Sequence, residues 1–230
     1  LRAIIHAYGF TEFEDAVEAI DKAIAIDNEY ALAYALKADV YYFDLGGSYS
    51  RTLKYLERAI NISPEDPYIN SIAGLIESDN GFIILEDGSY ELAKMSRGKK
   101  DLALKFFENT KNNYEIALVN IKFGTNKNPL GELLFDLDAT YLTNANLGEI
   151  KYELYFLYRD KRERQIAKKY LEEAVQHYTS ALSLAPSQED VEEIDESTIN
   201  SSEYENYLNN FSYVPQNIFI FEDTIKNNLT

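Results

Sequence analysis

Residues 30–66 read YALAYALKADVYYFDLGGSYSRTLKYLERAINISPED, and this segment indicates two successive helices joined by a turn. Thr52, Leu56 and Ala59 follow one another at steps of four and three, which places them on one face of a helix. The small residues on that face let a neighbouring helix approach closely, and Leu56 fills the groove between the two. Pro64 ends the helix because proline has no backbone N–H to continue it.

The same order of small, large and small residues recurs along the chain. The matching sets are Ala16, Ile20 and Ala23 with Asn28 in the proline position, Ala103, Phe107 and Thr110 more loosely, and Ala174, Tyr178, Ala181 and Pro186. A single unit of this kind cannot cover its own apolar face, so stacking of units is what makes such an array stable. We therefore expect several stacked helix pairs up to residue 186.

The helix that precedes each of these is clearest in the quoted segment. Tyr34, Lys37, Ala38 and Tyr41 stand at the spacing of an aromatic, an aliphatic, a small and a second aromatic position, and residues 45–49 supply the turn. In this order of residue types the segment resembles the tetratricopeptide repeat, in which two antiparallel helices form each unit of about 34 residues. The resemblance implies an all-α fold, an antiparallel helix-pair solenoid, for residues 1–186. The chain departs from the family at Lys37, at Thr52 where alanine is usual, and in a longer turn.

The pattern diverges in the middle of the chain. The elements expected there are a helix at 67–79, a long connection through Asn80-Gly81 and Asp87-Gly88, a helix at 98–122, a loop at 125–129, short helices at 131–143 and 147–160, and a long helix at 163–184. An irregular helical bundle is the alternative for residues after 66.

In the resembled family the first helix of each pair lines a concave groove and contacts a peptide. The corresponding positions are Leu32, Ala35, Asp39 and Tyr42 in the second unit, and Tyr68, Ser71, Leu75 and Ser78 in the third. Ala35 and Asp39 stand where a well-known subclass places the Lys and Asn of a carboxylate clamp, so that clamp is absent. The resemblance therefore implies a scaffold or adaptor for a neutral or basic peptide, while simple helix packing is the alternative role for its aromatic residues.

Charge and composition narrow the partners further. The chain carries 22 Lys plus Arg against 39 Asp plus Glu, a net charge of −17, which repels nucleic acid and anionic lipid. Residues 187–230 hold ten acidic residues and one basic residue, and we expect them to form an acidic tail or a fragment of a second domain. Cysteine is absent, and no apolar run approaches the roughly 18–20 residues of a membrane span, so we expect neither disulfides nor direct membrane insertion.

One stretch resembles a catalytic motif. Residues 133–140, LLFDLDAT, resemble the nucleophile motif of haloacid-dehalogenase-type phosphatases, which implies Asp136 as nucleophile and Asp138 as proton donor. Ala139 stands where that family has glycine, and the flanking sequence predicts helices instead of the parallel sheet that the chemistry needs. We therefore expect a protein that is not an enzyme and needs no cofactor, with the phosphatase as an alternative.

A second resemblance lies near the C-terminus. Residues 213–229 resemble the glutamine-loop segment of the nucleotide-binding domains of ATP-binding-cassette transporters, and Gln216 is the matching glutamine. A phosphate-binding loop does not precede it, because repeat helix occupies that stretch. The resemblance implies a regulatory or fused subunit of such a transport system, and an acidic tail with one apolar patch is the alternative.

The remaining signals are weaker. His177 and Glu173 fall short of a metal site and read as a helical side-chain pair, while residues 159–164 form a basic patch interrupted by acids that reads as a solvated helix junction. A cytoplasmic location is the default expectation. Because the chain begins at Leu1 inside a repeat unit, an upstream signal or lipid anchor stays open. The oligomeric state is not predicted.

Overall fold

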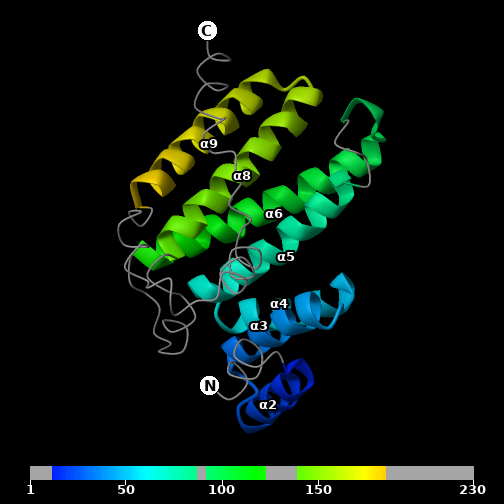
Figure 1. Ribbon diagram of the computed structural model, residues 1–230, viewed down its shortest axis with the longest axis vertical. Helices are drawn as coiled ribbons and strands as arrows, with labels where there is room; N and C mark the ends of the chain where they lie inside the picture. Colours follow the sequence, from blue (N-terminus) through cyan, green and yellow to red (C-terminus); the bar gives the residue numbers. More distant parts are fainter. Residues whose placement is uncertain (1–11, 87–91, 123–138, 185–230) are drawn as a thin grey trace, which may run out of the picture. The chain divides into compact units, whose positions relative to one another are not determined.

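The computed structural model describes residues 12–86, 92–122 and 139–184. The chain divides into a unit of residues 1–184 and a unit of residues 185–230, and all described residues belong to the first. Regular secondary structure in the described residues is entirely helical (Figure 1). The elements are α2 (Phe13–Ile26), α3 (Ala31–Asp39), the π turn η2 (Val40–Asp44), α4 (Tyr49–Ile62), α5 (Pro67–Glu86), the 3-10 turn η3 (Leu92–Lys94), α6 (Arg97–Lys122), α8 (Ala139–Asp160) and α9 (Arg164–Leu184).

Helices α3 and α4 form an antiparallel pair held by cations that lie over tyrosine rings. The contacts are Arg58 over Tyr34 at 5.8 Å, Lys37 over Tyr55 at 4.8 Å and Arg51 over Tyr41 at 4.8 Å, each measured to the ring centroid. A step forward along α3 is a step back along α4, which is the pattern of an antiparallel pair. Such contacts add attraction beyond simple burial of the rings.

The turn between these helices explains why the chain is longer there than a tetratricopeptide repeat. After η2, Gly46 adopts a positive φ of 63°, a conformation that glycine reaches without a steric penalty. A Cβ atom on Gly47 would lie 2.0 Å from Cδ1 of Tyr41, so only glycine fits at that point. The pair of glycines lets the chain reverse direction close to the end of α3.

Helices α5 and α6 pair through glycines on one helix and aromatic rings on the other. A Cβ atom on Gly74 would lie 2.7 Å from Cε1 of Tyr114, and one on Gly81 would lie 2.6 Å from Cε1 of Phe107. Both rings are buried, and the two contacts are two turns apart in opposite directions along the two helices. The missing side chains therefore let α5 and α6 approach closely over much of their length.

Helices α8 and α9 repeat this design. Gly148 of α8 faces the buried ring of Tyr178 of α9, whose Cδ1 would lie 2.8 Å from an added Cβ. Further along, Tyr158 and Tyr170 stack with their ring centroids 5.4 Å apart. Only residues 161–163 connect the two helices, so α8 and α9 are also antiparallel.

Consecutive pairs share their cores. One cluster of buried side chains joins α3, α4 and α5, a second joins α5, α6, α8 and α9, and a third joins α2 to α3 and η2. Each helix pair thus buries the apolar face of the next, as expected for stacked repeat units. The prediction of an all-α fold built from antiparallel helix pairs is confirmed for the described residues.

Two polar clusters cross-link the last three helices. Lys151, on α8, is 4% exposed, and its ammonium group lies 2.8 Å from Glu115 of α6 and 2.9 Å from Glu173 of α9. Glu108 of α6 accepts hydrogen bonds from the hydroxyls of Tyr158, at 2.9 Å, and Tyr170, at 2.7 Å. Burial alone would raise the pKa of Glu108, but these bonds and one from Lys111 lower it below its ordinary value.

Two of the predicted boundaries are wrong. The helix predicted at 67–79 continues to Glu86, because Asn80 donates to the carbonyl of Ile76 at 2.7 Å and to the hydroxyl of Tyr42 at 2.8 Å. The two short helices predicted at 131–143 and 147–160 are one helix from Ala139, in which Asn144 donates to the carbonyl of Thr140 at 2.7 Å. In both cases side-chain partners satisfy residues that are turn formers in isolation. The helices predicted at 98–122 and 163–184 match α6 and α9 to within one residue.

The glycine contacts predict how the fold responds to one methyl group. Gly74→Ala should lower the free energy of unfolding by about 1–2 kcal/mol, because the added Cβ overlaps the buried ring of Tyr114. Gly98→Ala is the matched control, since nothing lies within 4 Å of its Cβ position and alanine favours the helix by about 1 kcal/mol. Urea unfolding followed by circular dichroism measures both, and equal stability of the two variants would contradict the packing described.

Candidate functional site

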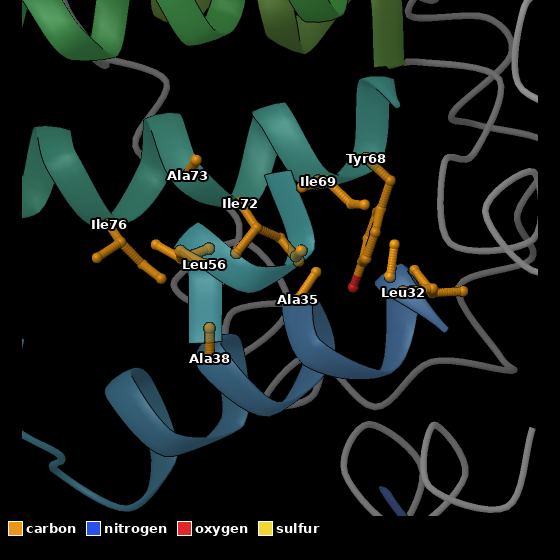
Figure 2. Packing of buried hydrophobic residues seen from close by; sticks show 11 residues of the cluster. Leu32, Ala35, Ala38, Leu56, Tyr68, Ile69, Ile72, Ala73 and Ile76 are labelled. Atoms are coloured by element: carbon orange, nitrogen blue, oxygen red, sulfur yellow. The ribbon is translucent and has the colours of Figure 1, made fainter. Parts of the chain in front are cut away.

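Three of the predicted groove residues belong to the core. Leu32 and Ala35 of α3 and Tyr68 of α5 are 3%, 0% and 7% exposed and pack in the cluster that joins α3, α4 and α5 (Figure 2). Their predicted exposure to solvent is therefore wrong. The physical reason is that these positions face the adjacent first helix, so the stacking of units covers them.

The hydroxyl groups of the two predicted serines are also unavailable to a partner. Ser78 is 8% exposed, and its hydroxyl donates to the carbonyl of Leu75 at 2.8 Å. The hydroxyl of Ser71 is buried and has no hydrogen-bond partner in the structure as described. Neither serine offers a free polar group to a partner in this arrangement.

The other predicted residues, Asp39, Tyr42 and Leu75, are partly or fully exposed. The hydroxyl of Tyr42, in η2, donates to a carboxylate oxygen of Asp79 on α5 at 2.7 Å, so it links two consecutive first helices. The buried surroundings and this carboxylate raise the pKa of Tyr42. The ring of Tyr42 therefore has a fixed orientation, with Phe43 packed against it edge to face at 4.9 Å.

Sequence reasoning missed the equivalent residues on α8. Gly148 faces Tyr178 of its partner helix, as Gly81 faces Phe107 and Gly74 faces Tyr114, and Ala38 is the small residue predicted in the second unit. Counting one, four and five residues on from Ala38, Gly74 and Gly148 gives residues on one face of each helix. The small residue next to a tyrosine-bearing second helix was the signal that could have located them.

We define the acidic–aromatic set as the exposed or partly exposed residues at these positions. Its members are Asp39, Tyr42 and Phe43 in the second unit, Leu75 and Asp79 in the third, and Glu149, Tyr152 and Glu153 in the fourth. The set combines carboxylates with rings and aliphatic carbon, which is the chemistry that favours a cationic or amphipathic ligand.

The two carboxyl groups on α8 have unusual electrostatics. Burial and the neighbouring charge of Glu153 raise the pKa of Glu149 from 4.5 to about 8, and burial raises that of Glu153 to about 7. Tyr152 stands between them, with its ring 4.7 Å from that of Phe156. No basic side chain in the described part of the chain makes an ion pair with either glutamate, so both retain their protons more readily than exposed carboxyls do.

The cations of the first helices are directed elsewhere. The 20 residues of α5 include no Lys or Arg. Lys37 of α3 forms an ion pair with Asp21 of α2, and Lys151 of α8 is held by carboxylates of α6 and α9. These cations are thus paired with carboxylates outside the acidic–aromatic set.

The other predicted sites divide into two groups. Asp136, Asp138 and Gln216 lie outside the described residues, so the phosphatase and transporter hypotheses stay predictions. His177 is described, and its Nδ1 lies 3.0 Å from Oδ1 of Asn144. Within residues 12–86, 92–122 and 139–184, no group of three His, Asp or Glu side chains is arranged to hold a metal ion.

No protein-family model matches the chain, and no curated protein matches it. A crystal structure of MamA is similar at 15% sequence identity over 76% of this chain and 94% of that chain, with a TM-score of 0.33. At this TM-score we draw neither fold nor function from the likeness. None of the helices in the described residues has the length and apolar character to cross a membrane.

The raised pKa values predict a pH dependence of stability. The unfolded chain ionises its glutamates near pH 4.5, whereas folded Glu149 and Glu153 hold their protons to about pH 8 and about pH 7. Their contribution is therefore complete below pH 4.5 and is lost as the pH rises toward 8. Glu108 and Glu173 have lowered pKa values and act oppositely, because their contribution is lost as the pH falls below the ordinary value of 4.5. The free energy of unfolding should be largest at about pH 5.

The variant Glu149→Gln isolates this effect. It should flatten the fall in melting temperature between about pH 5 and about pH 8, because glutamine cannot ionise. Glu172→Gln is the control, since Glu172 is exposed on α9 and its loss should leave the profile unchanged. Thermal unfolding across this range measures both, and identical profiles for the two variants would show that Glu149 is not the group responsible.

Proposed function

We propose that this chain is a protein-interaction scaffold whose first helices bind a basic peptide segment of a partner protein. The observation that carries the proposal is the charge arrangement of these helices, in which Lys37 and Lys151 are paired with carboxylates of neighbouring helices. In the part of the chain that the structure describes, Asp79, Glu149 and Glu153 make no ion pair. A partner's Lys or Arg would supply the missing cation. Such complementarity sets specificity and association rate more than raw affinity.

The exposed apolar side chains of the set would supply contact area. Phe43 is 43% exposed and Leu75 is 44% exposed, and both belong to helices linked by the bond between Tyr42 and Asp79. Long cationic side chains can bury their methylene stems on such surfaces while the charged end meets a carboxylate.

Binding to an array of short random-sequence peptides, graded from negative to positive net charge, tests the proposal. The native chain should prefer the positive peptides. The triple variant Asp79→Asn, Glu149→Gln and Glu153→Gln should lose about tenfold in affinity for them, because three favourable charge contacts are removed. The matched control changes three exposed carboxylates elsewhere, Asp15→Asn, Glu57→Gln and Glu172→Gln, and should bind as the native chain does.

A second variant separates charge from burial. Leu75→Ser should weaken all bound peptides whatever their charge, with little loss of stability because the side chain is already 44% exposed. Equal losses in the triple variant and its control would place the binding site elsewhere on the chain. A native chain without preference for positive peptides would overturn the proposal.

A further inference from the structure

Two exposed apolar side chains stand on either side of a carboxylate on α5. Leu75 is 44% exposed and Ile83 is 52% exposed, while Asp79 lies midway between them in the sequence and is partly exposed. Steps of four place the three residues on successive turns along one side of the helix. With a rise of about 1.5 Å per residue, neighbouring members are about 6 Å apart along the helix axis. We call this apolar, acidic and apolar sequence of side chains the α5 row.

The carboxylate of Asp79 gives the row its charge. Glu77 is 6% exposed and accepts a hydrogen bond from Tyr49 of α4 at 2.8 Å, so it is directed toward the second helices. The helix contains no Lys or Arg, and Asp79 makes no ion pair among the described residues. A cation between the two apolar side chains therefore meets a negative charge that no neighbouring cation balances.

The hydrogen-bond donors beside the row are already engaged. Asn80 donates to the carbonyl of Ile76 at 2.7 Å and to the hydroxyl of Tyr42 at 2.8 Å, and that hydroxyl donates to Asp79 at 2.7 Å. Ser78 donates to a carbonyl of its own helix. The row therefore presents carbon and carboxylate oxygen to a partner. An extended peptide also needs donors for its backbone carbonyl groups, whereas a helical peptide satisfies these groups internally.

We infer that the α5 row binds an amphipathic helix of the partner protein, aligned with α5, in which apolar, basic and apolar residues follow one another at intervals of about four. The apolar residues pack on Leu75 and Ile83, and the Lys or Arg between them meets Asp79. Phe43 is 43% exposed and packs against Tyr42, which bonds Asp79, so it adds apolar surface beside the centre of the row. The inference rests on the proposed function, because it gives the basic segment a conformation and a sequence pattern.

An extended peptide would match the row with a different sequence period. Side chains on one face of a strand recur every second residue, about 6.6 Å apart, and those on one face of a helix recur about every fourth residue, about 6 Å apart. Two peptides of identical composition therefore separate the two conformations. The helix-period peptide carries Leu, Lys and Leu at every fourth position, the strand-period peptide carries them at every second position, and alanine and glutamine fill the rest of both.

Fluorescence anisotropy of the two labelled peptides with the full chain tests the inference. The helix-period peptide should bind about tenfold more tightly, because its helix contacts all three members of the row and leaves no backbone group unsatisfied. Proline in place of an alanine on its far side should abolish this advantage, since the helix is broken while the three contact residues stay. Carbon-13 chemical shifts of the labelled peptide should move to helical values on binding.

The chain supplies matched controls for the row itself. Leu75→Ser and Ile83→Ser should each weaken binding of the helix-period peptide about fivefold, because each removes the apolar contact at one end of the row. Leu102→Ser and Val119→Ser, on α6, change apolar side chains of closely similar exposure, 45% and 51%, and should leave the affinity unchanged.

The outcomes separate this inference from the proposed function. Equal or tighter binding of the strand-period peptide would overturn the helical partner and leave a scaffold for basic peptides in place. Equal losses in the α5 variants and the α6 controls would have the same meaning, as would failure of the helix-period peptide to bind a chain that still prefers positive peptides. A chain that binds neither peptide and shows no preference for positive peptides would overturn both proposals.

Discussion

The close approach of two helices over a residue with little or no side chain is the constraint on which the rest of this structure depends. Gly74 under Tyr114, Gly81 under Phe107 and Gly148 under Tyr178 fix the rotation of each first helix about its own axis. A buried ring cannot move aside without opening a void, so the register of the two helices is fixed to a single choice. That register then decides which residues of α5 and α8 enter the core and which stay at the surface.

The same constraint explains which parts of the fold could be predicted from sequence. The spacing of Ala174, Tyr178 and Ala181 is local and survives in any helix, so α9 was found to within one residue. Asn80-Gly81 signals a turn in isolation, but here Gly81 receives Phe107 and Asn80 bonds Tyr42. These partners lie more than 25 residues away in the chain, and no local pattern reveals them. Tertiary contact therefore overrides turn propensity at this point.

The candidate surface was predicted less well than the fold, and for a related reason. Leu32, Ala35 and Tyr68 were assigned by analogy of position, although burial depends on how closely the next first helix approaches. Glu149, Tyr152 and Glu153 were missed because their helix was expected to be broken before residue 147. Gly148, which faces Tyr178, marks the side of α8 from which these three residues are counted. A small residue is thus a better guide to this surface than the apolar pattern around it.

Charge is distributed so that structure and recognition use different cations. Lys151 and Lys111 are committed to carboxylates inside the α6, α8 and α9 assembly, where removing one partner would leave a buried charge uncompensated. Among the described residues Glu149 and Glu153 have no such partner, and protonation is how a partly buried carboxyl avoids the same penalty. In the proposed complex an arriving cation lowers both pKa values and releases protons, so affinity for it rises with pH while stability of the free chain falls. The charged form of these glutamates destabilises the free chain, and a cationic ligand removes this cost. The surface is therefore selective for a ligand that neutralises it.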